Sequence, residues 1–127
     1  MIIGTGIDIC EVGRIAQSLQ RFGERFVKRV FTHDEIRYCQ SKRNSSERFA
    51  ARFAAKEAAT KALGTGIRLG VSWTSIEVGH APGGRPILRL SGNAAHIAER
   101  LGVKRISLSL THTEIIAMAM VVLEDGK

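Results

Sequence analysis

The chain has 127 residues and a formal net charge of +7 at pH 7. A chain of this length buries roughly two thirds of its unfolded surface on folding, so we expect a single domain over residues 1–127 that needs no disulfide. The positive charge indicates an acidic partner, but nucleic acid, an anionic membrane, an acidic protein or a phosphorylated small molecule would each satisfy it.

The two cysteines, Cys10 and Cys39, lack the paired spacing of metal ligands. The sequence shows neither a signal peptide nor an apolar run of about 18 residues. We therefore expect a cytoplasmic protein with free thiols and no membrane partner.

The first predicted element is a buried strand over residues 1–9, where two glycines interrupt an apolar run and suggest a close backbone approach. From Glu11 the apolar residues recur at three- and four-residue steps, which predicts an amphipathic helix with Gly23 as a weak point or break. Its core face should carry Val12, Ile15, Leu19, Phe22, Phe26 and Val30. Its other face carries four cations, an arrangement that is usually just solvated: Arg14, Arg21, Arg25 and Lys28.

Two capping patterns predict the next helices. Thr32 followed by Glu35 has the form of a capping box and starts a short helix that runs through Cys39. Asn44 followed by Glu47 repeats the pattern ahead of an alanine-rich helix, residues 47–63, which Gly64 should close as a left-handed C-cap.

The remaining sequence indicates short strands and one more helix. Strands are expected over residues 75–78 and 86–90, joined by a turn that contains Gly83 and Gly84. A helix over residues 93–101 should end at Gly102, and two final strands should meet in a turn near residues 111–114. The predicted fold class is α+β, with a small, mostly antiparallel sheet packed on helices.

Two separated carboxylates carry the first chemical signal. Helical spacing of four residues places Phe53, Glu57 and Lys61 on one face, together with Phe49, and Asp8 stands alone in the apolar N-terminal run. Carboxylates suit Mg²⁺, and lysines beside a glycine-rich turn suit phosphate oxygens, so the set indicates phosphoryl transfer. The alternatives are a helix N-cap for Asp8 and an ordinary surface ion pair for Glu57 with Lys61.

The segments GIDICEVGRI and FAAKEAATKALGTG together resemble the paired signature of the phosphopantetheinyl transferases, in their short single-domain form. The similarity continues through SWTSIEV, GGRPILRLSG and LSLTHTEIIAMAMVVLE in the same order. It implies an α+β homotrimer with active sites between neighbouring subunits. It also implies transfer of the phosphopantetheine arm of coenzyme A to a serine of an acidic apo acyl carrier protein, with release of adenosine 3′,5′-bisphosphate.

The resemblance assigns roles residue by residue. Asp8 and Glu57 match Mg²⁺ ligands, with Mn²⁺ as a substitute, and Lys61 matches a lysine that contacts the pyrophosphate. Glu57 would also orient a metal-bound water next to the serine or accept a proton through it, and Lys61 would neutralise or protonate the leaving phosphate. Asp34 and Glu35 are weaker candidates for the base. Longer, two-domain relatives carry a further acidic ligand where this chain has Cys10, so water should fill that position.

The remaining partners of coenzyme A are expected in four segments: Arg52, Gly64, Gly66, Gly84, Arg85, Pro86, Thr111 and His112. His112 between two threonines could instead be an ordinary turn residue. The cationic helix face (Arg14, Arg21, Arg25, Lys28) should dock the carrier protein. The apolar run over residues 115–123 exceeds what one small sheet face needs, which favours a subunit interface.

A small basic nucleic-acid-binding module is the leading alternative, since the net charge and the cationic helix suit it equally well. Aromatic residues make up only 6% of the chain and are spaced as core anchors, so the sequence offers no platform on which bases could stack. We therefore expect no nucleic-acid partner.

Overall fold

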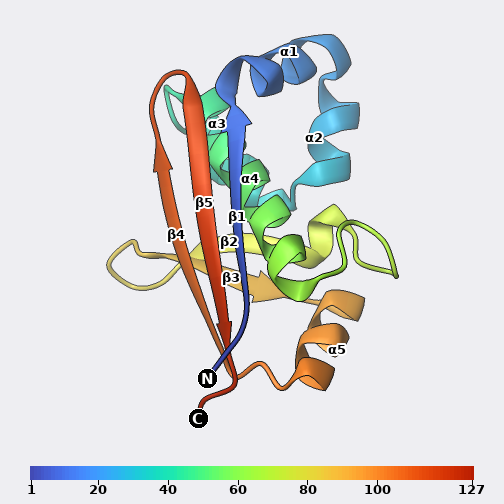
Figure 1. Cartoon of the computed structure of the whole chain (residues 1–127). Helices are drawn as coiled ribbons and strands as arrows, with labels where there is room; N and C mark the ends of the chain where they lie inside the picture. The colour runs from blue at the N-terminus through green and yellow to red at the C-terminus, as the bar shows by residue number, and fades with distance from the viewer.

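Three antiparallel strands form the larger of two sheets in the computed structural model, which describes residues 1–127 (Figure 1). They lie in the order β1 (Ile2–Glu11), β5 (Ile116–Glu124), β4 (Arg105–His112). The smaller sheet is an antiparallel hairpin of β2 (Ile76–His80) and β3 (Pro86–Leu90). The helices are α1 (Val12–Phe22), α2 (Glu24–Val30), α3 (His33–Gln40), α4 (Ser45–Leu63), the 3₁₀ turn η1 (Trp73–Ser75) and α5 (Gly92–Leu101). The α+β class is confirmed.

Helix α4 packs along the inner face of the larger sheet (Figure 1). Two glycines of β1 permit the contact, because a Cβ at Gly4 would lie 2.2 Å from the Ala62 carbonyl oxygen and one at Gly6 would lie 1.8 Å from that of Ala58. The expected close backbone approach is therefore confirmed. It brings the middle of β1 directly against the C-terminal half of α4.

Gly23 divides the predicted amphipathic helix into α1 and α2. Its backbone takes φ 54°, and its N–H closes α1 on the Leu19 carbonyl. The prediction that Phe22 belongs to the core face is wrong, because the chain changes direction there and leaves the ring 50% exposed. Val27 on α2 is buried instead.

The two predicted capping boxes have different outcomes. Thr32 and Glu35 form a capping box at α3, as expected. The Asn44–Glu47 box is wrong: Asn44 accepts a bond from the Arg48 Nε at 3.2 Å, and Glu47 pairs with His112 across the fold. Gly64 closes α4 in the left-handed conformation, which confirms the predicted C-cap.

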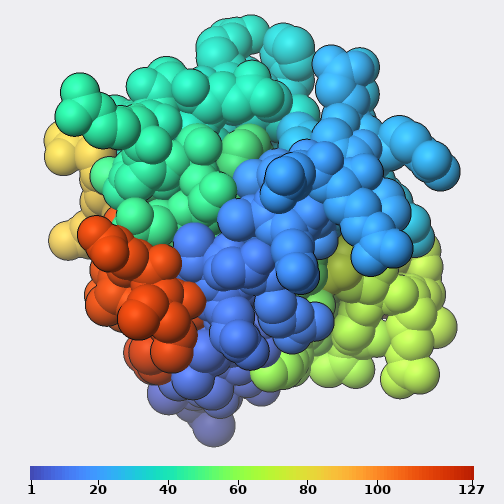
Figure 2. All heavy atoms as spheres, turned by 90° about the horizontal axis from the view of Figure 1, so that it is seen from above, coloured from blue at the N-terminus to red at the C-terminus, as the bar shows by residue number.

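The outer face of the larger sheet is apolar and exposed. Ile7 and Ile9 of β1 and Met120 of β5 are 55%, 57% and 46% exposed, and the register places Ile7 opposite Met120. No helix of the fold combines the length and the apolar character needed to cross a membrane. Seen from above, α1 and the end of β1 lie between the β4–β5 turn and the loop that follows α4 (Figure 2).

Candidate active site

Asp8, Glu57 and Lys61 meet where β1 crosses α4. The Lys61 Nζ donates to Asp8 Oδ1 at 2.9 Å and to the Ile7 carbonyl at 3.0 Å. Because Asp8 lies inside β1 and caps no helix, the N-cap alternative is wrong. The ordinary Glu57–Lys61 ion pair is not formed either, since Lys61 bonds to the neighbouring strand.

The charge balance of this group is incomplete. Glu57 is half-buried, and burial together with the adjacent Asp8 carboxylate raises its pKa. The bond from Lys61 to Asp8 raises the pKa of Lys61, so the lysine holds its proton. Two carboxylates thus share one ammonium, which is the electrostatic setting that favours a divalent cation.

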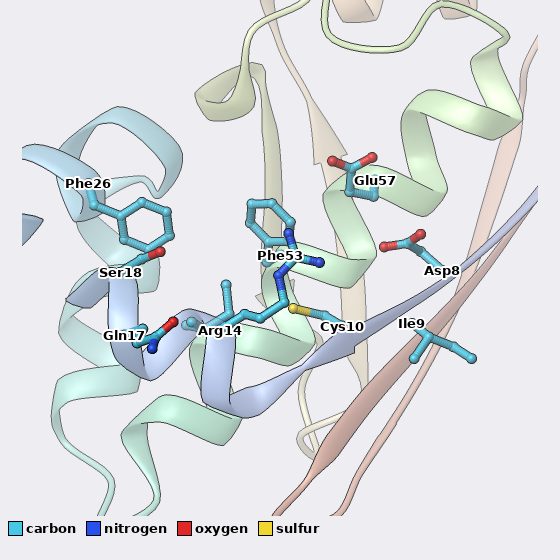
Figure 3. A pocket seen from close by; sticks show the side chains of 10 residues that line it. Asp8, Ile9, Cys10, Arg14, Gln17, Ser18, Phe26, Phe53 and Glu57 are labelled. Carbon is cyan, nitrogen blue, oxygen red and sulfur yellow. The ribbon is translucent and has the colours of Figure 1, made fainter. Parts of the chain in front are cut away.

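A pocket of about 470 Å³ opens beside the two carboxylates, between α1 and α4 (Figure 3). Asp8 and Glu57 lie at one end, and the rings of Phe26 and Phe53 form part of its wall. The Arg14 side chain extends along the pocket toward Phe53. The pocket therefore joins a carboxylate pair, a cation and an apolar wall.

Cys10 follows Asp8 by two residues on β1 and lies beside the carboxylates in the pocket lining. Its thiol lines the pocket wall but is largely buried, and burial followed by the Asp8 charge raises its pKa to about 11. A protonated thiol is a poor partner for a hard cation. Across the whole fold, no group of three or more His, Cys, Asp or Glu side chains is arranged to hold a metal, so Asp8 and Glu57 remain a two-carboxylate candidate.

Arg52 lies on another face of α4, away from this pocket. Its guanidinium is only 3% exposed, stacks 4.4 Å from the centre of the Tyr38 ring and approaches His80 Nε2 at 3.3 Å. Its Nε has no hydrogen-bond partner. Burial and the charges of Arg52, Lys42, Arg48 and Arg89 lower the pKa of His80. The cluster is cationic and lacks a carboxylate partner for Arg52.

The other residues expected to bind coenzyme A do not line the Asp8–Glu57 pocket of the same chain. Gly64 and Gly66 form the turn after α4, close in sequence to Lys61. Arg85 and Pro86 line a separate groove of about 550 Å³ with β4, next to the glycine turn of the hairpin that contains Gly84. Thr111 and His112 end β4, and the His112 Nδ1 lies 2.9 Å from Glu47 Oε1.

The four cations expected to dock a carrier protein are all exposed, but they lie on two helices: Arg14 and Arg21 on α1, Arg25 and Lys28 on α2. The expectation of one continuous helical face is therefore wrong. Only Lys28 has a nearby carboxylate, Glu24 at 3.5 Å.

Glu35, a weaker candidate for the base, is instead fully buried. It pairs with Lys56 at 2.7 Å, and both side chains are 0% exposed. No local pattern indicates this pair, because Glu35 lies 21 positions before Lys56 and on another helix.

A family model described as the 4′-phosphopantetheinyl transferase superfamily matches residues 4–119, which include the Asp8–Glu57 site. The chain belongs to this superfamily. A holo-[acyl-carrier-protein] synthase of Koribacter versatilis is 64% identical over 125 residues, covering 98% of this chain and 100% of the relative. The superfamily resemblance inferred from the paired sequence segments is confirmed.

Solved structures of other superfamily members share the fold. The holo-[acyl-carrier-protein] synthase of Neisseria meningitidis has a TM-score of 0.90 at 38% identity, covering 98% of this chain and 99% of that chain. The Bacillus anthracis holo-(acyl-carrier-protein) synthase, solved in complex with CoA (3′,5′-ADP), has a TM-score of 0.81 at 39% identity, with 99% of both chains covered.

Proposed function

We propose that this superfamily member transfers the 4′-phosphopantetheine group of coenzyme A to a serine of an acidic apo acyl carrier protein, in a Mg²⁺-dependent reaction that releases adenosine 3′,5′-bisphosphate. The observation that carries the proposal is the Asp8–Glu57–Lys61 group, whose two carboxylates line the pocket between α1 and α4. Full-length similarity to synthases of this name supports the same reaction. The proposed location is the cytoplasm.

The donor set fits a hard divalent cation. Asp8 and Glu57 supply carboxylate oxygens, and the raised pKa of Glu57 reflects in part an uncompensated charge beside Asp8. Mg²⁺, or Mn²⁺ in its place, would neutralise the charge that develops on the pyrophosphate. With only two protein ligands, the metal-free chain should bind the ion weakly unless coenzyme A is also present.

Glu57 and Lys61 have separate roles in the proposed transfer. In the reaction, the serine oxygen bonds to the β-phosphorus while the bond from that phosphorus to the bridging oxygen breaks. Glu57 accepts the serine proton directly or through a water. Lys61 neutralises or protonates the leaving phosphate.

The carrier protein would approach over α1. Arg14 lines the pocket beside the carboxylates, and the exposed Arg21, Arg25 and Lys28 extend the positive surface along α1 and α2. Opposite charges of this kind steer encounter and set partner choice. The apolar wall of Phe26 and Phe53 suits an apolar residue next to the target serine.

A homotrimer would complete the coenzyme A site. The exposed isoleucines and methionine on the outer sheet face need cover, which the corresponding faces of two further copies can supply around a threefold axis. The residues that lie away from the pocket would then serve a neighbouring active site: Arg52, Gly84, Arg85, Pro86, Thr111 and His112. Light scattering that reports an active monomer at micromolar concentration would contradict this assembly.

Intact-mass spectrometry of an apo carrier protein tests the proposal. Incubation with the chain, coenzyme A and Mg²⁺ should add one phosphopantetheine to the carrier serine, and EDTA should prevent it. A carrier protein that keeps its apo mass while the chain remains folded would refute the proposed reaction. Binding to a DNA or heparin column would not favour nucleic acid, since any basic protein binds these supports.

A further inference from the structure

Lys56 and Glu35 form a completely buried ion pair on the face of α4 opposed to α3 and β2. The Lys56 Nζ has three acceptors: Glu35 Oε1 at 2.7 Å, the Trp73 carbonyl at 3.0 Å and the Ile76 carbonyl. These use all three protons of the ammonium group. The pair therefore ties α4 to α3, to η1 and to the start of β2.

Glu35 is equally well bonded. Its Oε1 accepts the Thr32 backbone N–H at 2.9 Å in the capping box, and its Oε2 accepts the Val78 backbone N–H at 2.8 Å. Removing two charges from water is costly unless their remaining hydrogen bonds are made, and here they are made. The pair, with its backbone partners, is called the Lys56–Glu35 clamp below.

Most of the buried side chains of helix α4 are alanines, so a directional contact contributes strongly to its orientation. Seven alanines of the helix are buried: Ala50, Ala51, Ala54, Ala55, Ala58, Ala59 and Ala62. Methyl groups interlock little, so alanine packing alone resists rotation and sliding of the helix only weakly. The two glycines of β1 fix the distance between the helix and the strand. The clamp fixes the rotation of the helix about its own axis.

The clamp also reaches the wall of the pocket. Trp73, whose carbonyl accepts from Lys56, stacks its ring on Phe53 at 4.9 Å between centroids. Phe53 lines the pocket, and Glu57 follows Lys56 directly in the chain. A change at the clamp therefore bears on both the carboxylate and the apolar wall.

We propose that Lys56 and Glu35 are positioning residues: their buried pair sets the rotation of α4 that holds Glu57 beside Asp8 and holds Phe53 in the pocket wall. This inference rests on the proposed function, because the metal and the carrier protein are what that geometry serves. Neither residue touches the reacting atoms. Their effect passes through α4 and Trp73.

Two variants and a control test the clamp. The double variant Lys56→Met with Glu35→Gln removes both charges at similar side-chain volume. Glu35→Gln alone leaves the two hydrogen bonds from Lys56 to backbone carbonyls in place, so it can be measured if the double variant does not fold. Leu123→Ala is the control. Leu123 is a core residue of β5 that lies opposite Gly4 in the larger sheet, and it is not part of the clamp. It should lower Tm without disturbing the clamp.

Three measurements are made per folded molecule: Mn²⁺ binding by electron paramagnetic resonance with coenzyme A present, transfer kinetics, and the fluorescence of Trp73, the sole tryptophan. We expect the double variant to bind Mn²⁺ at least about threefold more weakly and to lose at least about tenfold in kcat, since small misplacements of catalytic groups are costly. Its Trp73 emission should shift to the red as the stack on Phe53 loosens, and Glu35→Gln should show a smaller change in the same direction. The control should keep wild-type values in all three.

The inference would be overturned if the variants had a lowered Tm, as the control has, but kept wild-type Mn²⁺ affinity and kcat. That result would show that the pair only stabilises the fold. A wild-type chain that transfers no phosphopantetheine and binds no Mn²⁺ is a different result, because it refutes the proposed function itself.

Discussion

Gly6→Ala should move Asp8 on β1 away from Glu57 and Lys61 on α4. The added Cβ would lie 1.8 Å from the Ala58 carbonyl oxygen and 2.8 Å from its carbon, where 3.0–3.4 Å is already a tight contact. Because both partners are backbone, β1 and α4 must move apart by roughly 1.2–1.6 Å at this point. Overpacking of this kind costs about 1–3 kcal/mol, and a rigid backbone contact favours the upper end.

The chemical consequence should exceed the loss of stability. Asp8 follows Gly6 by two residues on β1, and its partners Glu57 and Lys61 lie on the helix that must retreat. A displacement of about 1 Å can cost on the order of a hundredfold in rate. A loss of about 3 kcal/mol lowers Tm by about 10 °C in a domain of this size, so the variant should remain folded at room temperature.

Thermal melting and the carrier-protein mass assay measure both effects. Gly13→Ala is the matched control, since Gly13 lies on exposed α1 with nothing within 4 Å of its added Cβ. That change should raise stability by about 0.5–1 kcal/mol through helix propensity alone. A Gly6→Ala protein with wild-type Tm and wild-type turnover would refute the close strand–helix contact and the reasoning built on it.

Three further predictions address the site and its partner. Asp8→Ala or Glu57→Ala should abolish transfer while circular dichroism still reports a folded chain, and near-native turnover in either would mean that the metal site is misplaced. Glu57→Gln should raise Tm in EDTA at about pH 8 and not at about pH 4: a carboxyl whose pKa is raised on folding costs stability as pH rises through that pKa, and glutamine removes this cost. Reversing Arg14 and Arg21 to Glu should raise KM for the carrier protein tenfold or more at low salt, at about 1 kcal/mol for each exposed contact. Reversing Arg21 alone, which does not line the pocket, should leave KM for coenzyme A unchanged. An unchanged carrier KM would place docking on another face.

Local patterns indicate the parts of the candidate site that lie on one strand and one helix. The glycines of β1 indicate a close backbone approach, and the four-residue spacing of Glu57 and Lys61 places both on one helical face. Neither pattern identifies α4 as the partner of β1. It is the resemblance of the two segments to a paired family signature that joins Asp8 to Glu57.

Contacts between distant elements were beyond such patterns. Periodicity continued across Gly23, so it misassigned Phe22, whose exposure follows from a change of chain direction that spacing does not record. Glu47 matched a capping box, but tertiary structure gave it a stronger partner in His112. Glu35 resembles a weak candidate for the base in sequence alone, because nothing local reveals that Lys56 meets it in the core.

The arrangement of Lys61 indicates how metal and coenzyme A depend on each other in the proposed reaction. Lys61 now neutralises Asp8, so it is not free to meet a phosphate, and Glu57 carries a charge that burial disfavours. If Lys61 moves to the pyrophosphate, Asp8 loses its cation and the two carboxylates repel each other and the incoming phosphates. Asp8 and Glu57 would hold a divalent cation, whose charge would offset both costs and leave Lys61 available to the phosphate. Metal and coenzyme A should therefore each strengthen the binding of the other, since each favours the same position of one lysine.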